Sequence, residues 1–504
     1  LSLTGGGGRE PRPGCSSEGR FFFAPQLGYR SGVDAAERIY ITSASEGETA
    51  SRLAEELARR IEDDIAARNL PPGGSLGSVR ELCQRYRVGR SVAREALGLL
   101  ERRGLGRLRP GPCGGFVLTR PRPETIGRQL ADYFRAAGLR LHQLLDAREA
   151  VDLMAARLAA ANRVDTAALR LEAAGRAGDL AGMLAVRTEI ARLAAEPVLQ
   201  LFVECLNDLT LDFARSDPAQ PSGAFPRASV ESAMVEALRR GDADAAVAAA
   251  AQAHRELAEH LVERPPSVPV AIAASRLQAA GETLAASIAR TLAAEIASSG
   301  RAGMRLGSEW ELCERFRVSR LTLRQAVRLL QDSGLVECRR GRGNGLIVRG
   351  LRASGAIRLM LAYLIAEKMD PWTAGTILFQ INCFVPALAV IRADADERRA
   401  LEAALARVES RDPFDRYDLL SLVQCVSRAA NSPIIDLFSR CLVAYEARFR
   451  QSLALTLPAS AQESYFRLIR RLLDRVPVGD ASALEWAKAE SSALMLEMSL
   501  RRPI

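Results

Sequence analysis

The sequence predicts a mostly α-helical fold divided into several domains. The chain has 504 residues, which is more than one hydrophobic core usually organises. It is rich in Ala, Leu and Arg, which favour helices, and only 5% of its residues are aromatic. A basic segment with the pattern of two short helices, Leu82–Leu105, recurs later in the chain as Leu312–Leu335.

The first expected helix starts near Ser51. Leu53, Leu57 and Ile61 are spaced four residues apart there, which places them on one apolar stripe of a helix. The sequence PPGG at 71–74 then breaks the helix. This pattern indicates one amphipathic helix at the start of the first repeated unit.

Capping signals mark a second helix and a turn in both copies. Ser78 is followed three residues later by Glu81, which is the spacing of a capping box. The second helix should end near Arg87, the third should begin at Arg90, and Gly104 should stop it as a C′ glycine. The same points in the second copy are Ser308, Glu311, Arg317, Arg320 and Gly334.

Glycine-rich segments follow the third helix in both copies. RLRPGPCGGFVLTR at 107–120 and VECRRGRGNGLIVRG at 336–350 each contain two short β-prone runs joined by glycines, with Arg at the tip. This pattern predicts a β-hairpin, or wing. Three helices followed by such a hairpin form a winged helix-turn-helix.

The two units are copies of one another. Residues 80–105 and 310–335 align without gaps, and 13 of these 26 positions are identical. Ala- and Leu-rich amphipathic sequence follows each copy, and the Pro-rich VERPPSVPV joins the two units. The predicted organisation is a disordered tail at 1–44, winged helix-turn-helix domains at 45–120 and 276–350, all-α helical-bundle domains at 121–262 and 351–504, and a linker at 263–275.

The net charge of +9 is concentrated in the repeats. Residues 80–109 hold nine Arg and three Glu, a balance of +6, and residues 309–342 hold eight Arg and five acidic residues, a balance of +3. These two balances sum to +9, so the rest of the chain is close to neutral. Basic charge confined to two repeated segments indicates polyanion-binding modules, although charge alone also allows Arg on solvated helix faces.

In a helix-turn-helix the third helix enters the major groove, and the residues of its first turns reach the bases. Arg suits this role because its guanidinium can bond bidentately to guanine or clamp a phosphate. Val92, Leu97, Leu321 and Leu323 are expected to pack inward instead. The expected DNA-binding residues are Arg90, Ser91 and Arg94 in copy one, Arg320, Thr322 and Arg324 in copy two, and Arg109, Arg340 and Arg342 at the wing tips.

The order RELCQRYRVGRSVAREALGLLERRGL followed by a glycine-rich wing resembles the GntR family of bacterial transcription regulators. The helical segments after each copy resemble the FadR-type ligand-binding (FCD) domain of that family, most clearly at 144–161 and 235–254. The resemblance implies binding to double-stranded DNA, with Arg80 added to the contacts. Trp310 stands in the second copy where Arg80 stands in the first. The wing glycines that the family uses fall on Gly114, Gly115, Gly343 and Gly345.

Many FCD domains hold a divalent metal through an Asp-x-x-x-His pair and two further His, and this chain departs from that pattern. Glu231 stands at the third ligand's place, and His254 is one residue out of register with the fourth. We therefore expect no metal and no cofactor. The Asp and His places of the pair fall on Met183 and Arg187 in the first helical domain and on Asp418 and Leu422 in the second.

Arg148, in the segment DAREAVD, is a candidate ligand for an anionic small-molecule effector, and an ordinary ion pair on a helix surface is the alternative. The chain has three His and no Cys-His, Ser-His or HExxH arrangement. We therefore expect no catalytic residues and no enzymatic activity.

Cysteine usage and hydropathy indicate a cytoplasmic protein with no membrane partner. The nine cysteines form no CxxC pair, and their odd number fits a reduced compartment. No signal peptide is visible, and the longest apolar run, Ile377–Ile391, is interrupted by Gln380, Asn382 and Pro386. Because a membrane span needs about 18 apolar residues, we interpret this run as a buried core helix.

These observations predict a sequence-specific, effector-responsive transcription regulator. Ordinary members of the family bind palindromes as homodimers, and here one chain carries two DNA-binding units. The hypothesis is a fused pseudo-dimer on a bipartite operator, and a further homodimer is left open. The alternative is an effector-sensing interaction protein in which one or both DNA-binding units have decayed.

Overall fold

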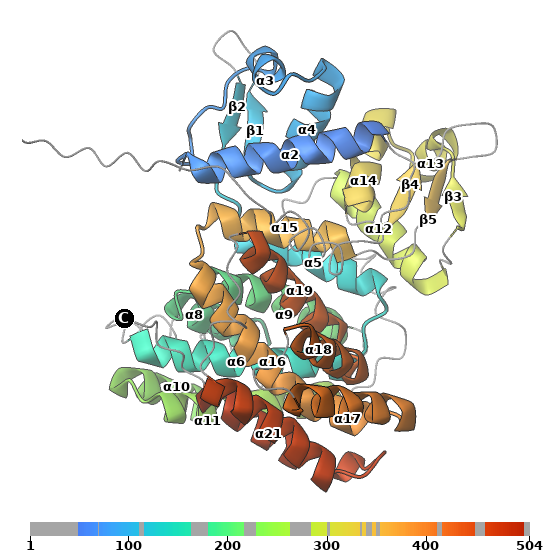
Figure 1. Ribbon diagram of the computed structural model, residues 1–504. Coiled ribbons are helices and arrows are strands. Elements are labelled where there is room, and N and C mark those ends of the chain that lie inside the picture. The colour runs from blue at the N-terminus through green and yellow to red at the C-terminus, as the bar shows by residue number, and fades with distance from the viewer. Residues whose placement is uncertain are drawn as a thin grey trace, which may run out of the picture.

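The computed structural model describes residues 49–68, 70–109, 115–162, 180–215, 228–262, 284–299, 303–332, 335–338, 345–348, 353–410, 416–448 and 459–497. These residues form a mostly α-helical fold with two small antiparallel sheets, which confirms the predicted fold class. Figure 1 shows two winged helix units at one end of the molecule and a body of helices at the other. The predicted tail and linker lie outside the described residues.

The first winged helix unit, which we call module 1, has the predicted order of elements. The core-facing side of its first helix is formed by four buried residues, Ala54, Leu57, Ala58 and Ile61. The prediction that Leu53 belongs to this apolar stripe is wrong, because its side chain is 54% exposed. The module comprises α2 (Thr49–Ala67), α3 (Val79–Tyr86), α4 (Arg90–Arg102), β1 (Gly106–Arg109) and β2 (Gly115–Leu118), with β1 and β2 paired as an antiparallel hairpin.

The second winged helix unit, module 2, repeats this order and adds a strand that the sequence did not predict. Its middle strand, β5, pairs with both β3 and β4. In module 1 the place of β3 is taken by a single bridge between Ser75 and Val117. The module comprises α12 (Leu284–Ser299), β3 (Arg305–Gly307), α13 (Glu309–Phe316), α14 (Arg320–Asp332), β4 (Val336–Cys338) and β5 (Leu346–Val348).

Among the residues that the structure describes, only helices follow each module, and we call them helical regions 1 and 2. Buried side chains from both regions form one continuous hydrophobic cluster, so the two regions share a core. Region 1 comprises α5 (Pro123–Ala136), α6 (Leu141–Asn162), α8 (Leu180–Leu193), α9 (Pro197–Arg215), α10 (Ala228–Arg240) and α11 (Ala243–Val262). Region 2 comprises α15 (Ala353–Ala366), α16 (Pro371–Arg392), α17 (Ala395–Glu409), α18 (Arg416–Ala430), α19 (Pro433–Arg448), α21 (Ala459–Arg475), η2 (Ala481–Ala483) and α22 (Leu484–Glu497).

The two regions meet through equivalent residues. Pro197 opens α9 and Pro433 opens α19, and each helix carries a Phe five residues later, Phe202 and Phe438. Both Phe side chains are buried, and their rings stack with centroids 3.6 Å apart and an interplanar angle of 3°. A residue that contacts its own equivalent is typical of a two-fold symmetric interface.

Charged side chains also join the two regions. Asp146 of α6 pairs with Arg392 of α16, and its second oxygen lies 3.1 Å from Nζ of Lys488 on α22. Lys488 is also 2.9 Å from Oε2 of Glu149. Asp146 is buried and the side chain of Lys488 is only 11% exposed, so the pairing of opposite charges offsets the cost of removing them from water.

Each module docks on the helical region of the other half. In module 1, α2 packs against α15, and Ala362 of α15 lies inside the hydrophobic core of the module. In module 2, α12 packs against α5 of region 1. Figure 1 shows α2 above α15, and α12 beside α5. Ion pairs accompany the first of these contacts: Glu55 with Arg358, Asp63 with Arg448, and Arg120 with Glu367.

The long apolar run predicted as a core helix is α16. It is the one helix among the described residues that is long and apolar enough to cross a membrane, and 78% of its most apolar window is buried inside the protein. Pro386 lies within this helix. The buried surface confirms the interpretation of α16 as a core helix.

Candidate nucleic-acid interface

Both modules build the predicted capped helix and tight turn. The backbone N–H of Ser78 donates to Oε2 of Glu81 at 2.8 Å, and the backbone N–H of Glu81 donates to Oγ of Ser78 at 3.3 Å. Arg87 ends α3 in a left-handed conformation with φ of 54°, which turns the chain towards α4. The equivalent residues of module 2, Ser308, Glu311 and Arg317, repeat this arrangement.

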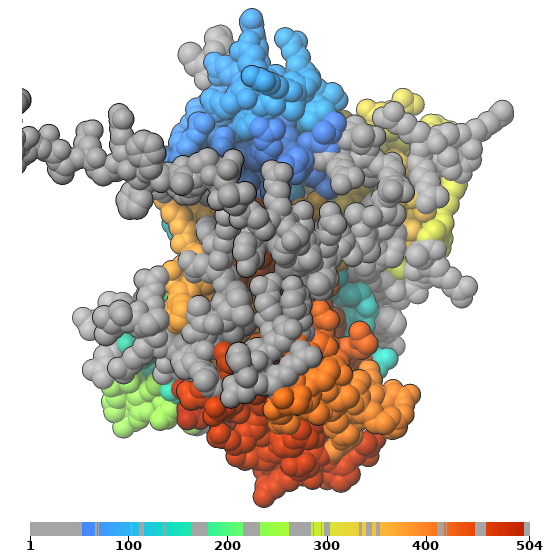
Figure 2. Space-filling view, in the orientation of Figure 1, coloured from blue at the N-terminus to red at the C-terminus, as the bar shows by residue number. Residues whose placement is uncertain are grey.

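The outward face of α4 carries the predicted DNA-binding residues of module 1. Its inward face is buried through four apolar side chains, Ala93, Ala96, Leu97 and Leu100, which fix the rotation of the helix. Arg90, Ser91 and Arg94 of α4 are exposed, and so is Arg80 of α3. Within the part of the chain that the structure describes, these four side chains have no hydrogen-bond or ion-pair partner. They are available to a ligand outside the module, which stands out at one end of the molecule in Figure 2.

Other arginines of module 1 hold the module together. Arg103 is buried and pairs with Glu62 of α2, which ties the end of α4 to the first helix. Nη1 of Arg85 donates to the backbone oxygen of Leu76 at 3.2 Å. The sequence could not separate these structural arginines from the free ones, because burial depends on packing between helices.

The wing of module 1 is a regular hairpin. Gly106 pairs with Leu118 and Arg109 with Gly115, and Arg109 is exposed at the end of β1 as predicted. Gly115 is buried, and a side chain there would meet the backbone oxygen of Gly77 at 2.6 Å. This geometry gives Gly115 a packing role that does not need DNA. Gly114 lies outside the described residues.

Module 2 presents a different surface on the same scaffold. Arg320 and Arg324 are exposed, and Nε of Arg324 lies 3.0 Å from Oε1 of Glu309. Thr322 is half-buried, and its hydroxyl lies 2.9 Å from Oγ of Ser319. Gly345 has φ of 154° and fits against the backbone of Gly307, as Gly115 fits against Gly77. Arg340, Arg342 and Gly343 lie outside the described residues.

The prediction that Leu321 packs inward is wrong. The structure leaves this side chain 69% exposed in the first turn of α14, because the core of module 2 is already filled by Leu323, Ala326 and Leu330. Trp310 on α13 is also exposed, at 63%. The other inward predictions hold: Leu97 and Leu323 are buried, and Val92 is half-buried.

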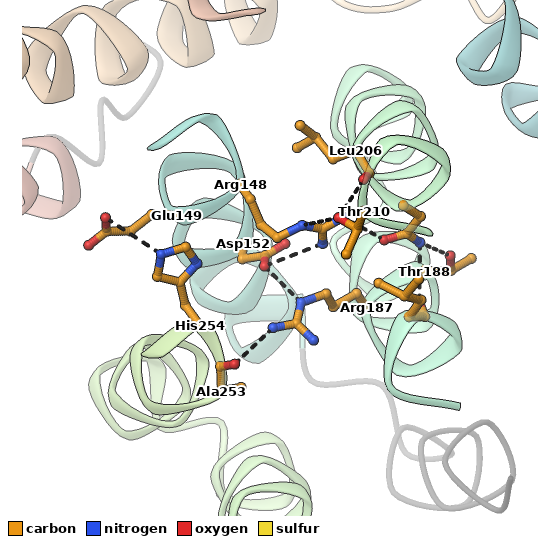
Figure 3. Close-up of polar contacts among 11 residues, drawn as sticks. Arg148, Glu149, Asp152, Arg187, Thr188, Leu206, Thr210, Ala253 and His254 are labelled. Carbon is orange, nitrogen blue, oxygen red and sulfur yellow. Dashed lines mark hydrogen bonds and ion pairs between the residues drawn. The ribbon is translucent and has the colours of Figure 1, made fainter. Parts of the chain in front are cut away.

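Region 1 contains a cluster of buried polar side chains around Arg148, shown in Figure 3. Arg148 is fully buried, and its Nε and Nη2 donate to Oγ1 of Thr210 at 3.1 Å and to Oδ1 of Asn207 at 3.0 Å. Its Nη1 has no hydrogen-bond acceptor and lies 3.7 Å from Oδ2 of Asp152. Burial lowers the pKa of Arg148 to about 10, and Asp152 opposes that shift, so the side chain is charged at pH 7.

Arg187 and His254 complete this cluster and do not fit a metal site. Nε of Arg187 lies 2.9 Å from Oδ2 of Asp152, so a fixed cation already stands at the place expected for a metal-binding His. Nε2 of His254 lies 3.8 Å from Oε2 of Glu149, and burial lowers the His254 pKa to about 3. The described residues contain no group of three His, Cys, Asp or Glu that could hold a metal ion.

A match to a family model agrees with the winged helix geometry of both modules. Residues 53–112 and 284–345 each match the family model of bacterial regulatory proteins of the gntR family. Among solved structures, a GntR from Streptococcus agalactiae is 21% identical and covers 41% of this chain and 99% of its own chain, with a TM-score of 0.31. No curated protein matches the chain.

The two modules define a class, the DNA-binding proteins of the winged helix-turn-helix type. Their family matches make the statement more specific, because GntR-type DNA-binding domains point to a transcription regulator. Sequence reasoning missed two features of the site: the Arg324–Glu309 ion pair, and the exposure of Leu321 beside it. A Glu at position 309 in place of Val79 was the available signal for the ion pair.

Proposed function

We propose that the chain is a transcription regulator that works as a covalent pseudo-dimer, whose two modules bind two unlike half-sites of one bipartite operator. The observation that carries this proposal is the stacking of Phe202 on its equivalent Phe438, which joins the two halves as a homodimer joins two chains. The exposed Arg90, Arg94 and Arg320 supply the positive charge that DNA requires. Covalent linkage keeps the second module at a high effective concentration, so DNA binding should persist on dilution.

Selection of bound sequences from a random DNA pool tests this proposal. Arg90→Ala and Arg320→Ala should each blur a different half of the selected site, at a cost of about 1–3 kcal/mol of binding free energy. Arg467→Ala is the matched control, because this exposed Arg lies on α21, far from both modules in Figure 1. A palindromic site that responds to only one of the two substitutions would contradict the pseudo-dimer.

We also propose that region 1 senses a small anionic effector. The support is the positive Arg148, whose Nη1 lacks a hydrogen-bond acceptor, next to a second buried guanidinium on Arg187. An effector bound there would shift the population of module poses and so change operator affinity. Citrate and smaller carboxylates should raise the melting temperature of the intact chain, and Arg148→Lys should weaken that effect. Equal responses of both proteins to every carboxylate would argue against this site.

A second candidate function is an effector-sensing interaction protein with one or both modules decayed. The observation that favours it is the exposure of Trp310 and Leu321, where module 1 has Arg80 and Ser91. Absence of any enriched DNA sequence would support this candidate. Neither candidate includes an enzymatic step, a metal, a cofactor or a membrane. Both act in the cytoplasm, and light scattering measures whether the fused chain forms a further homodimer.

A further inference from the structure

The outward faces of the two third helices differ at the positions that would meet DNA bases. The repeats align with a constant offset of 230, so Ser91 corresponds to Leu321 and Glu95 corresponds to Gln325. All four side chains are exposed. In each module the two positions are four residues apart, which places them one above the other on one face of the helix. The two modules therefore offer different chemistry at equivalent places.

Leu321 is held on this face by the packing of its helix. Oγ of Ser319 accepts the backbone N–H of Thr322 at 3.2 Å and caps the start of α14. Leu323 and Ala326 are fully buried on the opposite side, so rotation of α14 would pull them out of the core. The 69% exposure of Leu321 is thus imposed by the fold. In the major groove, an aliphatic side chain at such a position can contact the 5-methyl group of thymine.

Gln325 gives module 2 a second base preference, for adenine. It is exposed one turn after Leu321, and its amide can bond bidentately to N6 and N7 of adenine. Neighbouring base pairs are about 3.4 Å apart, and side chains at i and i+4 have Cβ atoms about 5–6 Å apart. The two side chains can therefore contact neighbouring base pairs. Glu95, its counterpart in module 1, is a pure acceptor and suits the cytosine amino group instead.

The ion pair of Arg324 is a further difference between the two third helices. Nε of Arg324 lies 3.0 Å from Oε1 of Glu309, and Nη2 donates to Oε2 at 3.2 Å. Both carboxylate oxygens therefore contact the guanidinium. Arg94, the counterpart of Arg324, has no such partner, since Val79 stands where Glu309 stands. A guanidinium held by a carboxylate is less free to bind guanine bidentately.

The surroundings of Leu321 favour DNA over a protein as the partner. Arg317 in the turn after α13 and Arg320 and Arg328 on α14 are exposed, so the apolar Leu321 side chain lies among cations. A surface that binds an apolar protein face would be depleted of such charges at its centre. A basic surface with a single aliphatic contact matches a DNA major groove.

We propose that module 2 selects a half-site with a thymine read by Leu321 through its methyl group and a neighbouring adenine read by Gln325, whereas module 1 selects a different half-site. This inference rests on the proposed function, because it assumes that both modules bind one operator. It assigns the asymmetry of that operator to two positions of the third helix.

Removal of single methyl groups from DNA tests the role of Leu321 directly. In the selected operator, each thymine of the half-site that depends on Arg320 is replaced in turn by deoxyuridine, which keeps every hydrogen bond and lacks only the methyl. One position should lose about fourfold in affinity, as expected for one buried methyl-sized group. Leu321→Ser should bind the thymine and uracil operators equally. Deoxyuridine in the half-site that depends on Arg90 is the matched control and should have no effect.

Exchange of the second residue tests Gln325. Gln325→Glu, which places the side chain type of module 1 in module 2, should move the selected base at one position from adenine to cytosine and lower affinity for the original site about five- to 150-fold. Both positions are exposed, so melting temperatures of the variants should equal that of the parent chain.

The outcomes separate this inference from the proposed function. A bipartite site whose affinity is the same with uracil at every thymine overturns the inference and leaves the pseudo-dimer standing. A site that depends on Arg90 but not on Arg320 overturns both, because module 2 then does not bind DNA. In that case, a protein that binds the parent chain but not the Leu321→Ser variant would identify the exposed apolar residues as a protein-binding surface.

Discussion

Helical regions 1 and 2 share one architecture, but only region 1 has charged side chains at the centre of its long helix. The helices α6 and α16 both have 22 residues and begin 230 positions apart, so Arg148 corresponds to Leu378 and Asp152 to Asn382. Leu378 is buried in an apolar setting, whereas Arg148 is buried among polar groups. Region 2 therefore forms the same kind of helical bundle without such charges. The architecture that the two regions share thus does not require the charges of region 1.

The largest expected effect comes from Asp152→Ala. Asp152 is the anion nearest to two buried guanidinium groups, with Oδ2 at 2.9 Å from Nε of Arg187 and 3.7 Å from Nη1 of Arg148. Its removal leaves both cations without compensation, so the free energy of unfolding should fall by about 3–5 kcal/mol. Denaturant unfolding followed by circular dichroism measures this change.

Asp244→Ala is the matched control for Asp152→Ala. Asp244 also pairs with an Arg, Arg157, but is 93% exposed, so its pair is screened by solvent. The control should change stability by less than about 0.5 kcal/mol. Equal effects of the two substitutions would mean that water reaches the buried cluster and screens its charges.

The next largest effect is expected at the stacked Phe202 and Phe438, where the two regions contact each other through equivalent residues. Phe202→Ala and Phe438→Ala each remove one ring of the stacked pair and open a cavity in the shared core, at a cost of about 3–4 kcal/mol. Because the two rings stack on each other, the double variant should cost less than the sum of the single ones. Additive effects would show that the two rings are stabilised by separate surroundings, and would weaken the analogy with a dimer interface.

Much of each module could be predicted from local sequence. The capping boxes at Ser78 and Ser308 and the exposed Arg90 and Arg320 follow from short patterns, because a cap or a helix face depends on neighbours within four residues. The contact of Arg120 with Glu367 joins residues 247 positions apart. No local pattern encodes such a pair, so the docking of each module on the opposite half became visible only in the structure.

The orientation of Leu321 shows why part of the site escaped prediction. Apolar residues in an amphipathic helix are expected to face inward, and Leu321 and Leu323 are only two positions apart. They cannot both lie on the buried face, and sequence alone did not show which one the core takes. Arg148 is a similar case, because its full burial depends on Asn207 and Thr210 of a helix about 60 positions away.

The pH dependence of stability tests region 1 in particular, because the buried His254 lies there. Burial lowers its pKa to about 3, against 6.5 in an unfolded chain. Below pH 6.5 the unfolded chain therefore binds a proton that the folded chain does not, so stability should fall between about pH 6.5 and 3, by up to about 1.4 kcal/mol per pH unit.

The contribution of His254 is measured as a difference between variants, because several carboxylates titrate in the same range. Burial raises the pKa of Glu196 to about 7, so ionisation of the buried Glu196 lowers the stability of the folded chain as pH rises. Glu196 is present in the parent and in both variants, so its contribution cancels in the difference. His254→Gln should flatten the profile relative to the parent chain, and the half-buried His260→Gln should not. Parallel profiles for parent and His254→Gln would contradict a neutral, buried His254.

The smallest effect is expected when region 1 is given the residues of region 2. The structure aligns these helices at Pro197 and Pro433, an offset of 236 that also pairs the left-handed Ala195 with Asn431. Arg187 therefore corresponds to Val423 and not, as the motif alone indicated, to Leu422, so the triple variant is Arg148→Leu, Asp152→Asn and Arg187→Val. It removes cations and anion together, which is often neutral or stabilising, while Asn207 and Thr210 lose their donor at a cost. The free energy of unfolding should therefore change by no more than about 1 kcal/mol. The carboxylate response of the parent should disappear in this variant; if the response survives, the effector site lies elsewhere and the charges of region 1 have another role.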